Sequence, residues 1–142
     1  MRIYPDTSFL VSLYLQDDNT DRAVLATTRN PPPFLITALH RAEFANAVSL
    51  RVFRWEISRR AARLAKAQFR QDASVGRFEL LSLPSSLYAE AESLSSRRTP
   101  RLGARTLDVL HVASARLLDA EAFLTFDKRQ ARLARAEGLK TP

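Results

Sequence analysis

Short apolar runs alternate with longer helical patterns along the whole chain, and this alternation limits the possible folds more than any other feature. Pro and Gly residues separate the segments, because Pro cannot continue a helix and Gly tolerates sharp turns. Extended segments are predicted at residues 3–4, 34–36, 78–83 and 122–126. Strands that alternate with helices form parallel sheets with right-handed crossovers. The sequence therefore predicts an α/β fold, with a three-layer α/β/α arrangement and a central parallel sheet of four to five strands.

Helices are predicted between and after these strands. They cover residues 9–15, 20–29, 38–53, 58–73, 85–94, 107–120 and 128–137. Residues 95–105 are polar and basic and contain Pro100 and Gly103, so we expect a loop there. Leu139-Lys140-Thr141 has room for only the stub of a fifth strand. No repeat, low-complexity segment or linker interrupts the pattern, which predicts a single domain over residues 1–142.

Composition narrows the functional classes. The chain has 46% hydrophobic and 26% charged residues, which is typical of a globular protein. It has no cysteine, which excludes disulfides, zinc–thiolate sites, iron–sulfur clusters and thiol nucleophiles. No stretch approaches the roughly 18 apolar residues of a membrane span, and no signal-like segment precedes the first strand. We therefore expect a soluble, cytoplasmic protein without membrane contact.

The chain is strongly basic, with 22 lysine and arginine residues against 15 acids and a net charge of +7. Such a balance suits a polyanionic partner such as nucleic acid. The alternative is a general preference for arginine, which dominates lysine throughout the sequence. Net charge alone does not distinguish nucleic-acid binding from a general preference for arginine. The positions of the acidic residues give further information.

Two aspartates directly follow predicted strands. Asp6 lies where the first strand leads into a helix, and Asp127 repeats this position after the fourth strand. The carboxyl ends of parallel strands meet at one edge of the sheet, where ligands bind in open α/β folds. Thr7 or Ser8 is predicted as the N-cap of the first helix, which leaves the Asp6 carboxylate free for a ligand. The alternative is that Asp6 merely caps this helix.

Asp108 and Glu43 lie on largely apolar helices. Residues 107–115 are apolar nearly all round, which indicates a buried helix. A charge there is costly unless it is paired or binds a metal. The alternatives are a solvated helix end or a pair with Arg105 for Asp108, and an ordinary solvated position for Glu43. Glu43 lies in the first two turns of the helix after the second strand, within reach of the same sheet edge.

Four carboxylates at one edge repel one another unless a cation neutralises them. Because the chain offers oxygen ligands and no cysteine, Mg²⁺ or Mn²⁺ held partly by water is the favoured ion. Such an ion lowers the pKa of bound water and stabilises charge on a phosphate during in-line displacement. An acidic metal site in a basic protein has the electrostatics of a nuclease, in which arginines hold the phosphate backbone.

The same residues resemble the pattern of the PIN-domain family. The matching segments are Asp6-Thr7-Ser8, Thr37 with Glu43 six residues on, Leu107-Asp108-Val109-Leu110-His111-Val112-Ala113 and Thr125-Phe126-Asp127. Each segment is short, but together their order and spacing cover essentially the whole chain. The short length makes VapC-type toxins of toxin–antitoxin pairs the most similar group. The resemblance implies a Mg²⁺- or Mn²⁺-dependent endoribonuclease, usually a homodimer, which is silenced by a cognate VapB-type antitoxin.

The resemblance also implies roles for individual residues. The acidic catalytic site would consist of Asp6, Glu43, Asp108 and Asp127. Asp6 and Asp108 would be direct metal ligands, while Glu43 and Asp127 would bind directly or through water. Supporting polar groups would be Thr7, Ser8, Asn46 and Thr125. A PIN-fold module that binds RNA or an antitoxin with little catalytic activity is the alternative, and the presence of all four acids argues against it.

Basic and aromatic residues elsewhere are candidates for RNA contact. The predicted loop before the helix of Asp108 contains Arg97, Arg98, Arg101 and Arg105. We expect these arginines to bind the RNA backbone, and the alternative is that the loop is simply solvated. Trp55 is a candidate for base stacking, although packing against a partner or the core is favoured. His40 and His111 are expected to have packing or supporting roles, because a metal-activated water needs no histidine base.

Other classes that place an aspartate after the first strand fit less well. Haloacid-dehalogenase-like phosphatases need a second aspartate two residues later, and that position is Ser8. A response-regulator receiver needs an aspartate after a middle strand, where this chain has Ser82-Leu83-Pro84. Dinucleotide binding needs a glycine-rich loop, and the whole chain has three glycines.

Overall fold

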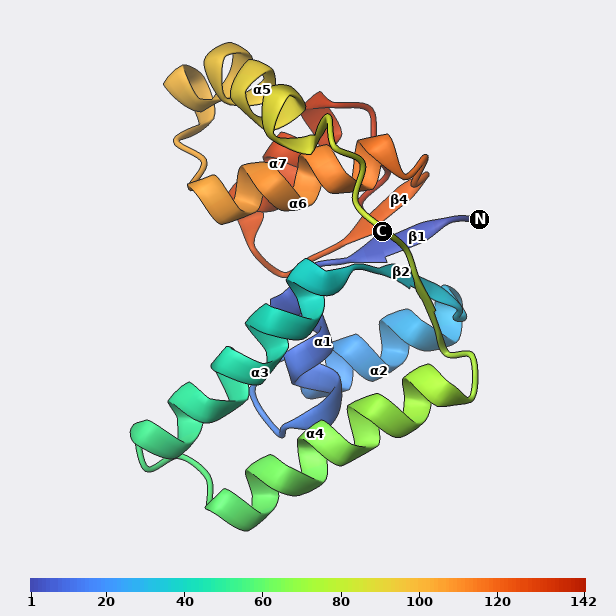
Figure 1. Ribbon diagram of the computed structural model, residues 1–142, viewed down its shortest axis with the longest axis vertical. Helices are drawn as coiled ribbons and strands as arrows, with labels where there is room; N and C mark the ends of the chain where they lie inside the picture. The colour runs from blue at the N-terminus through green and yellow to red at the C-terminus, as the bar shows by residue number, and fades with distance from the viewer.

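The chain folds into a parallel β-sheet between two layers of helices, as Figure 1 shows for the computed structural model of residues 1–142. The strands are β1 (Ile3–Pro5), β2 (Phe34–Ile36), β3 (Phe78–Leu80) and β4 (Ala122–Leu124). Their order in the sheet is β3-β2-β1-β4, and every neighbouring pair is parallel. The predicted three-layer α/β/α fold is confirmed, with four strands in its sheet.

The C-terminal residues extend this sheet by a single pairing. Lys140 forms an isolated parallel bridge with Ala122 in β4. The Phe123 amide donates to the Lys140 carbonyl at 2.7 Å, and the Lys140 amide donates to the Glu121 carbonyl at 3.0 Å. The predicted stub of a fifth strand is therefore present as one bridge beside β4.

Seven helices cover the two faces of the sheet, and none of them combines the length and apolar character that a membrane span needs. They are α1 (Thr7–Tyr14), α2 (Thr20–Arg29), α3 (Ala38–Phe53), α4 (Arg59–Ser74), α5 (Leu87–Leu102), α6 (Thr106–Leu117) and α7 (Lys128–Ala136). Helices α1 to α4 lie on one side of the sheet and α5 to α7 on the other (Figure 1). Successive strand residues alternate between the two sides, so Ile3 packs towards α1 to α4 and Tyr4 towards α5 to α7. Because both faces are covered, β1, β2 and β4 are completely buried, which explains their unbroken apolar sequences.

Helix α5 is longer than predicted, since it continues to Leu102 where the sequence indicated a loop from Ser95 onwards. Pro100 lies in its last turn, where the missing N–H removes only one helical hydrogen bond. The helix packs along α6, and two of its arginines pair with Glu137 after α7. These tertiary contacts hold the segment helical until Gly103, whose φ of 63° ends the helix in the left-handed region. The predicted loop is therefore helix over most of its length.

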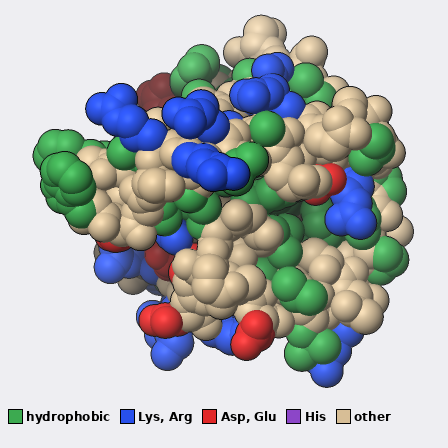
Figure 2. All heavy atoms as spheres, turned by 90° about the horizontal axis from the view of Figure 1, so that it is seen from below, with side chains coloured by type: hydrophobic (Ala, Val, Ile, Leu, Met, Phe, Trp, Pro, Cys, Tyr) green, Lys and Arg blue, Asp and Glu red, His purple; other side chains and the backbone are tan.

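Basic and apolar side chains gather together on the face formed by α4 and the end of α3. Figure 2 views the molecule from this side and shows Lys and Arg side chains beside exposed hydrophobic ones. The exposed arginines of α4 are Arg59, Arg60, Arg63 and Arg70. Phe53 and Trp55, which follow each other closely at the end of α3, are 79% and 94% exposed. Trp55 is thus not part of the core, and its exposure is typical of a residue that contacts a partner or a base.

Candidate active site

The carboxyl ends of the parallel strands meet at one edge of the sheet, and a polar pocket of about 420 Å³ opens there. All four predicted acids line it, namely Asp6 from the β1–α1 junction, Glu43 from α3, Asp108 from α6 and Asp127 from the β4–α7 junction. The other lining residues are Thr7, Ser8, Arg105, Thr106, Leu107, His111 and Gln130. The fold thus gathers acids from four separate segments around one space.

Asp6 caps helix α1, so the prediction that Thr7 or Ser8 is the N-cap was wrong. One carboxylate oxygen of Asp6 accepts the Phe9 amide at 2.6 Å, and the Ser8 hydroxyl donates to the carboxylate at 2.9 Å. The Thr125 hydroxyl donates to Oδ2 at 2.6 Å. Asp6 has extended backbone angles, and its carboxylate accepts one of the amides that the first helical turn leaves without a partner. Asp6 therefore has a structural task in addition to lining the pocket.

The burial of Asp6 favours a cation beside it. The residue is 4% exposed. Burial raises the pKa of its carboxyl above the usual range, although hydrogen bonds from Thr125, Phe9 and Ser8 oppose this shift. The charged form is therefore costly in the present surroundings. A nearby positive charge stabilises the charged form, since an opposite charge within a few ångströms lowers the pKa of a carboxyl.

Asp127 caps α7 in the way that Asp6 caps α1. Its Oδ1 accepts the amides of Arg129 at 2.8 Å and Gln130 at 3.0 Å. Thr125 lies between the two aspartates, because its hydroxyl donates to Asp6 and accepts the Asp127 amide at 3.0 Å. Thr125 therefore links the ends of two adjacent strands, β1 and β4, through the carboxylate of Asp6 and the backbone of Asp127.

Asp108 is 7% exposed in the first turn of α6, and Arg105 pairs with it. Nε of Arg105 lies 3.2 Å from Asp108 Oδ2, and the Arg105 amide donates to the same oxygen at 3.2 Å. Nη2 of Arg105 lies 3.5 Å from Asp127 Oδ2. The alternative that Asp108 pairs with Arg105 is thus present in the structure, and this pairing raises the pKa of the guanidinium. Arg105 links two acids of the pocket while its own side chain is 68% exposed.

Glu43 is held by a chain of hydrogen bonds that begins in β1. The Tyr4 hydroxyl lies 2.9 Å from Nδ1 of His111, and Nε2 of His111 bonds the Glu43 carboxylate. The Thr7 hydroxyl donates to the same carboxylate oxygen at 2.6 Å. Burial pushes the pKa of Glu43 upwards, but the hydrogen bond and charge of His111, together with Thr7, outweigh it and leave the pKa below its usual range. Glu43 is therefore an oriented carboxylate.

Tyr4 is a member of this network that the sequence did not reveal. Its side chain is completely buried, and burial raises the pKa of the phenol far above its usual value, so the hydroxyl stays protonated. In the neutral form of His111, a Tyr4 hydroxyl that donates to Nδ1 leaves the imidazole proton on Nε2, which faces Glu43. The supporting role predicted for His111 thus has a physical basis, since His111 connects a core tyrosine to a pocket acid.

His40 completes the capping box of helix α3 from within the core, with Thr37 as the N-cap. Its Nδ1 accepts the Thr37 amide at 3.0 Å, and its Nε2 lies 2.8 Å from the Pro5 carbonyl oxygen. The side chain is fully buried, and burial lowers the pKa of the imidazole to about 3, with the charge of His111 acting in the same direction. His40 is therefore neutral in the folded protein, which agrees with a packing role.

We expect His40 to make the fold sensitive to mild acid. Below its ordinary pKa of 6.5 the unfolded chain binds a proton that the folded chain refuses until about pH 3. The free energy of unfolding therefore keeps its full value above the ordinary pKa and decreases as the pH is lowered. The loss is about 2 kcal/mol at a pH of roughly 5. His40→Gln retains a donor and an acceptor without titrating, so its free energy of unfolding should lack this loss. Urea unfolding of both proteins in neutral and mildly acidic buffer tests the prediction, and equal losses in the two would contradict it.

The donor set of the pocket fits a hard divalent cation in kind. Carboxylate oxygens are the preferred ligands of Mg²⁺ and Mn²⁺, and four carboxylates line this one space. No three acidic or histidine side chains converge into a ready-made metal centre, however. The physical reason is that protein donors hold the carboxylates: hydroxyl groups hold Asp6, and Arg105 holds Asp108. The chemistry of the residues suits the ion, and Arg105 occupies a carboxylate that the ion would need.

The arginines predicted to bind RNA are only partly near this pocket. Arg97 and Arg98 lie on α5 and pair with Glu137 at 3.2 Å and 2.7 Å. Arg101 is exposed in the last turn of α5 and does not line the pocket. Of the four, only Arg105 does.

Two further polar residues are placed differently from the prediction. Asn46 is exposed on α3 and is absent from the pocket lining. Gln130, which was not predicted, lines the pocket and is 3% exposed. It lies three residues after the N-cap Asp127, and a glutamine at that spacing is the signature of a helix start. This spacing is the signal that could have identified Gln130.

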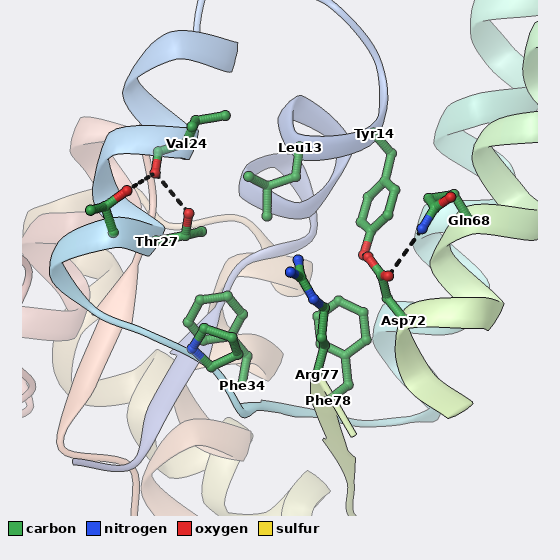
Figure 3. A pocket seen from close by; sticks show the side chains of 11 residues that line it. Leu13, Tyr14, Val24, Thr27, Phe34, Gln68, Asp72, Arg77 and Phe78 are labelled. Carbon is green, nitrogen blue, oxygen red and sulfur yellow. Dashed lines mark hydrogen bonds between the residues drawn. The ribbon is translucent and has the colours of Figure 1, made fainter. Parts of the chain in front are cut away.

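A second pocket of about 390 Å³ lies at the opposite edge of the sheet (Figure 3). Phe34 and Phe78, which line it, are the first residues of β2 and β3. Its one carboxylate, Asp72, already accepts hydrogen bonds from Tyr14 at 2.7 Å and from Gln68 at 3.0 Å. This pocket therefore lacks the acid cluster, and the pocket at the carboxyl edge remains the candidate active site.

The comparisons with known proteins agree with this architecture. A family model described as PIN domain matches residues 3–136. No curated protein sequence matches the chain. Among solved structures, the fold is similar to VapC20 of Mycobacterium tuberculosis, described as a sarcin-ricin loop cleaving toxin, with a TM-score of 0.70, 20% identity and coverage of 97% of both chains.

Two other solved structures have similar folds. FitAcB from Neisseria gonorrhoeae has a TM-score of 0.71 and 16% identity, covering 98% of this chain and 95% of that one. VapBC2 from Rickettsia felis, bound to a DNA fragment from its promoter, has a TM-score of 0.64 and 16% identity, covering 100% and 98%. At such identities the likeness shows the fold.

Proposed function

Since the chain belongs to the PIN-domain family, we propose that it is a Mg²⁺- or Mn²⁺-dependent endoribonuclease and the toxin of a type II toxin–antitoxin pair. The observation that carries the proposal is the meeting of four acids in one pocket of a protein whose net charge is +7. The similar fold of a sarcin-ricin loop cleaving toxin supports it. RNA is then the substrate, and its phosphodiester bonds are hydrolysed.

The proposed roles are those that the family resemblance implies for the four acids. The ion would be bound directly by Asp6 and Asp108, and directly or through water by Glu43 and Asp127. When bound, it would lower the pKa of a water molecule and stabilise charge on the phosphate. Thr125 and Ser8 orient the Asp6 carboxylate, while His111 and Thr7 orient Glu43. Such outer contacts fix the direction of ligand oxygens.

We also propose a VapB-type antitoxin as partner and a homodimer as the assembled form. The similar fold of a chain in the VapBC2 structure supports the first. The exposed Phe53 and Trp55 offer the large apolar contacts that protein interfaces use at their centre. Co-purification with the product of the adjacent open reading frame tests the partner. A toxic chain without any small neighbouring partner counts against it.

A second candidate function is a binding module with little catalysis. The observation that favours it is Arg105, which pairs with Asp108 and Asp127 and so offsets part of the negative charge of the pocket without a metal. The two candidates differ in what a divalent ion does to RNA in the presence of the protein.

Metal-dependent cleavage is the expected result for the wild-type protein. RNA should be cut with Mg²⁺ or Mn²⁺ and remain intact with EDTA. Asp108→Asn removes a proposed direct ligand and should lower kcat/KM by about 100-fold or more, because even the loss of an outer contact to a metal ligand costs about 10- to 100-fold. Asp119→Asn is the matched control, since Asp119 is an exposed aspartate outside the pocket. Cleavage that neither EDTA nor Asp108→Asn reduces would leave the metal-nuclease proposal without support.

A further inference from the structure

A basic hollow of about 400 Å³ adjoins the acidic pocket at the start of α7. Its lining consists of Arg105, Asp127, Lys128, Arg129 and Arg132, with no hydrophobic residue. Two of these residues, Arg105 and Asp127, also line the acidic pocket, so the two spaces are adjacent and share part of their lining. Positively charged side chains therefore lie directly beside the acid cluster. We call Lys128, Arg129 and Arg132, together with Arg105, the α7 seat.

The cations of α7 in this seat are free to bind an external anion. Lys128, Arg129 and Arg132 are exposed, and none of their side chains takes part in an ion pair or a hydrogen bond of the structure. Two arginines of the neighbouring helices differ in this respect, since Arg98 of α5 and Arg116 of α6 are bound to Glu137 at 2.7 Å and 2.9 Å. A ligand at the seat displaces no internal partner of these three cations.

Arg105 connects the seat to the acids. Its guanidinium reaches Asp108 at 3.2 Å and Asp127 at 3.5 Å, yet its side chain is 68% exposed. An arginine offers five N–H donors in a planar fork that matches phosphate oxygens. It therefore has donors left for a ligand that arrives from the solvent side.

We propose that the α7 seat binds the phosphodiester backbone of the RNA strand next to the bond that is cleaved. This inference rests on the proposed function and adds the place where the substrate enters. A hollow without apolar lining suits a polyanion, whereas the centre of a protein interface is depleted in charge and rich in apolar side chains. The face formed by α4 and the end of α3 combines arginines with the exposed Phe53 and Trp55. These apolar side chains are what a protein interface needs, so we assign that face to a protein partner.

The test compares two double variants that each remove two positive charges. Arg129→Ala with Arg132→Ala removes two of the four cations of the seat, and Arg135→Ala with Lys140→Ala removes exposed cations that lie outside it. Affinity for a 2′-O-methyl single-stranded RNA is measured by fluorescence anisotropy in EDTA over a range of KCl concentrations. The seat variant should bind about tenfold more weakly or worse, and its salt slope should fall by roughly 1.4, or about 0.7 for each lost phosphate contact. The control variant should bind like wild type.

Several outcomes would overturn the inference. Equal affinities of the seat variant and wild type, equal losses in both variants, or no RNA binding by the wild type each contradict it. Loss of antitoxin binding with intact RNA binding assigns the seat to a protein instead. The measurement needs neither metal nor cleavage, so a wild type that binds RNA through the seat and fails to cut it refutes the proposed function alone. Thermal unfolding verifies that both variants are folded, as expected for exposed side chains.

Discussion

Asp6→Asn is expected to lower kcat/KM for RNA cleavage by about 100-fold or more, since it removes the charge of a direct metal ligand. The folded protein should keep its stability within about 1 kcal/mol, because asparagine and aspartate are nearly equal as N-caps. Oδ1 of the new amide still accepts the Phe9 amide, which Asp6 now accepts at 2.6 Å. The substitution also removes a buried carboxylate whose pKa burial raises, and whose ionised form is therefore costly.

Asp6→Ala separates the two tasks of this residue. It removes the ligand and the cap together, so cleavage should fall as in Asp6→Asn while the free energy of unfolding drops by about 1–2 kcal/mol. The Ser8 and Thr125 hydroxyls also lose their shared acceptor. Urea unfolding and cleavage assays of both variants give the comparison. Wild-type cleavage by Asp6→Asn would mean that Asp6 is a cap and nothing more.

The fold was predictable because its main signals are local. A strand that is buried on both faces is an unbroken apolar run, and residues 34–36 and 122–124 are such runs between helical patterns. Parallel strands have their carboxyl ends at one edge of the sheet, and β1 pairs directly with β4, so the residues that follow these two strands are neighbours. The gathering of Asp6 and Asp127 at one pocket follows from these two facts.

The predictions that were wrong concern the N-cap of α1 and the length of α5. The first depends on a choice between adjacent residues, and the second on contacts with residues far along the sequence. Asp6, Thr7 and Ser8 are all good N-caps, and only the backbone angles of the folded chain select Asp6. The extension of α5 through Pro100 depends on pairs with Glu137, which lies far along the sequence. Propensity reports local preference and is overruled by such tertiary contacts.

The orientation of Glu43 was equally hidden. Tyr4 in β1 has the sequence context of an ordinary strand residue, and its hydrogen bond to His111 exists only because α6 packs on the face of the sheet to which Tyr4 points. The periodicity of neither segment encodes which polar atoms face each other inside the core. Buried polar pairs of this kind need the packed structure for their recognition.

His111→Leu is expected to destabilise the fold by about 2 kcal/mol or more. It takes away the hydrogen-bond partner of the fully buried Tyr4 hydroxyl, and an unsatisfied buried polar group costs about 1–3 kcal/mol. Glu43 loses its contact with His111 in the same step, so kcat/KM should also fall, by about tenfold. Urea unfolding and cleavage kinetics measure the two effects.

Tyr4→Phe provides the decisive comparison, because it removes the hydroxyl that His111→Leu leaves without a partner. If the two side chains act as a pair, the double variant should be less destabilised than the sum of the single variants, with a coupling energy of about 1–2 kcal/mol. Ser114 and Thr37 also lie close enough to the phenol to lower its pKa slightly against the effect of burial. If either of them accepts the Tyr4 hydroxyl once His111 is gone, the two losses add. Additive losses would therefore show that His111 is replaceable as the hydrogen-bond partner of Tyr4.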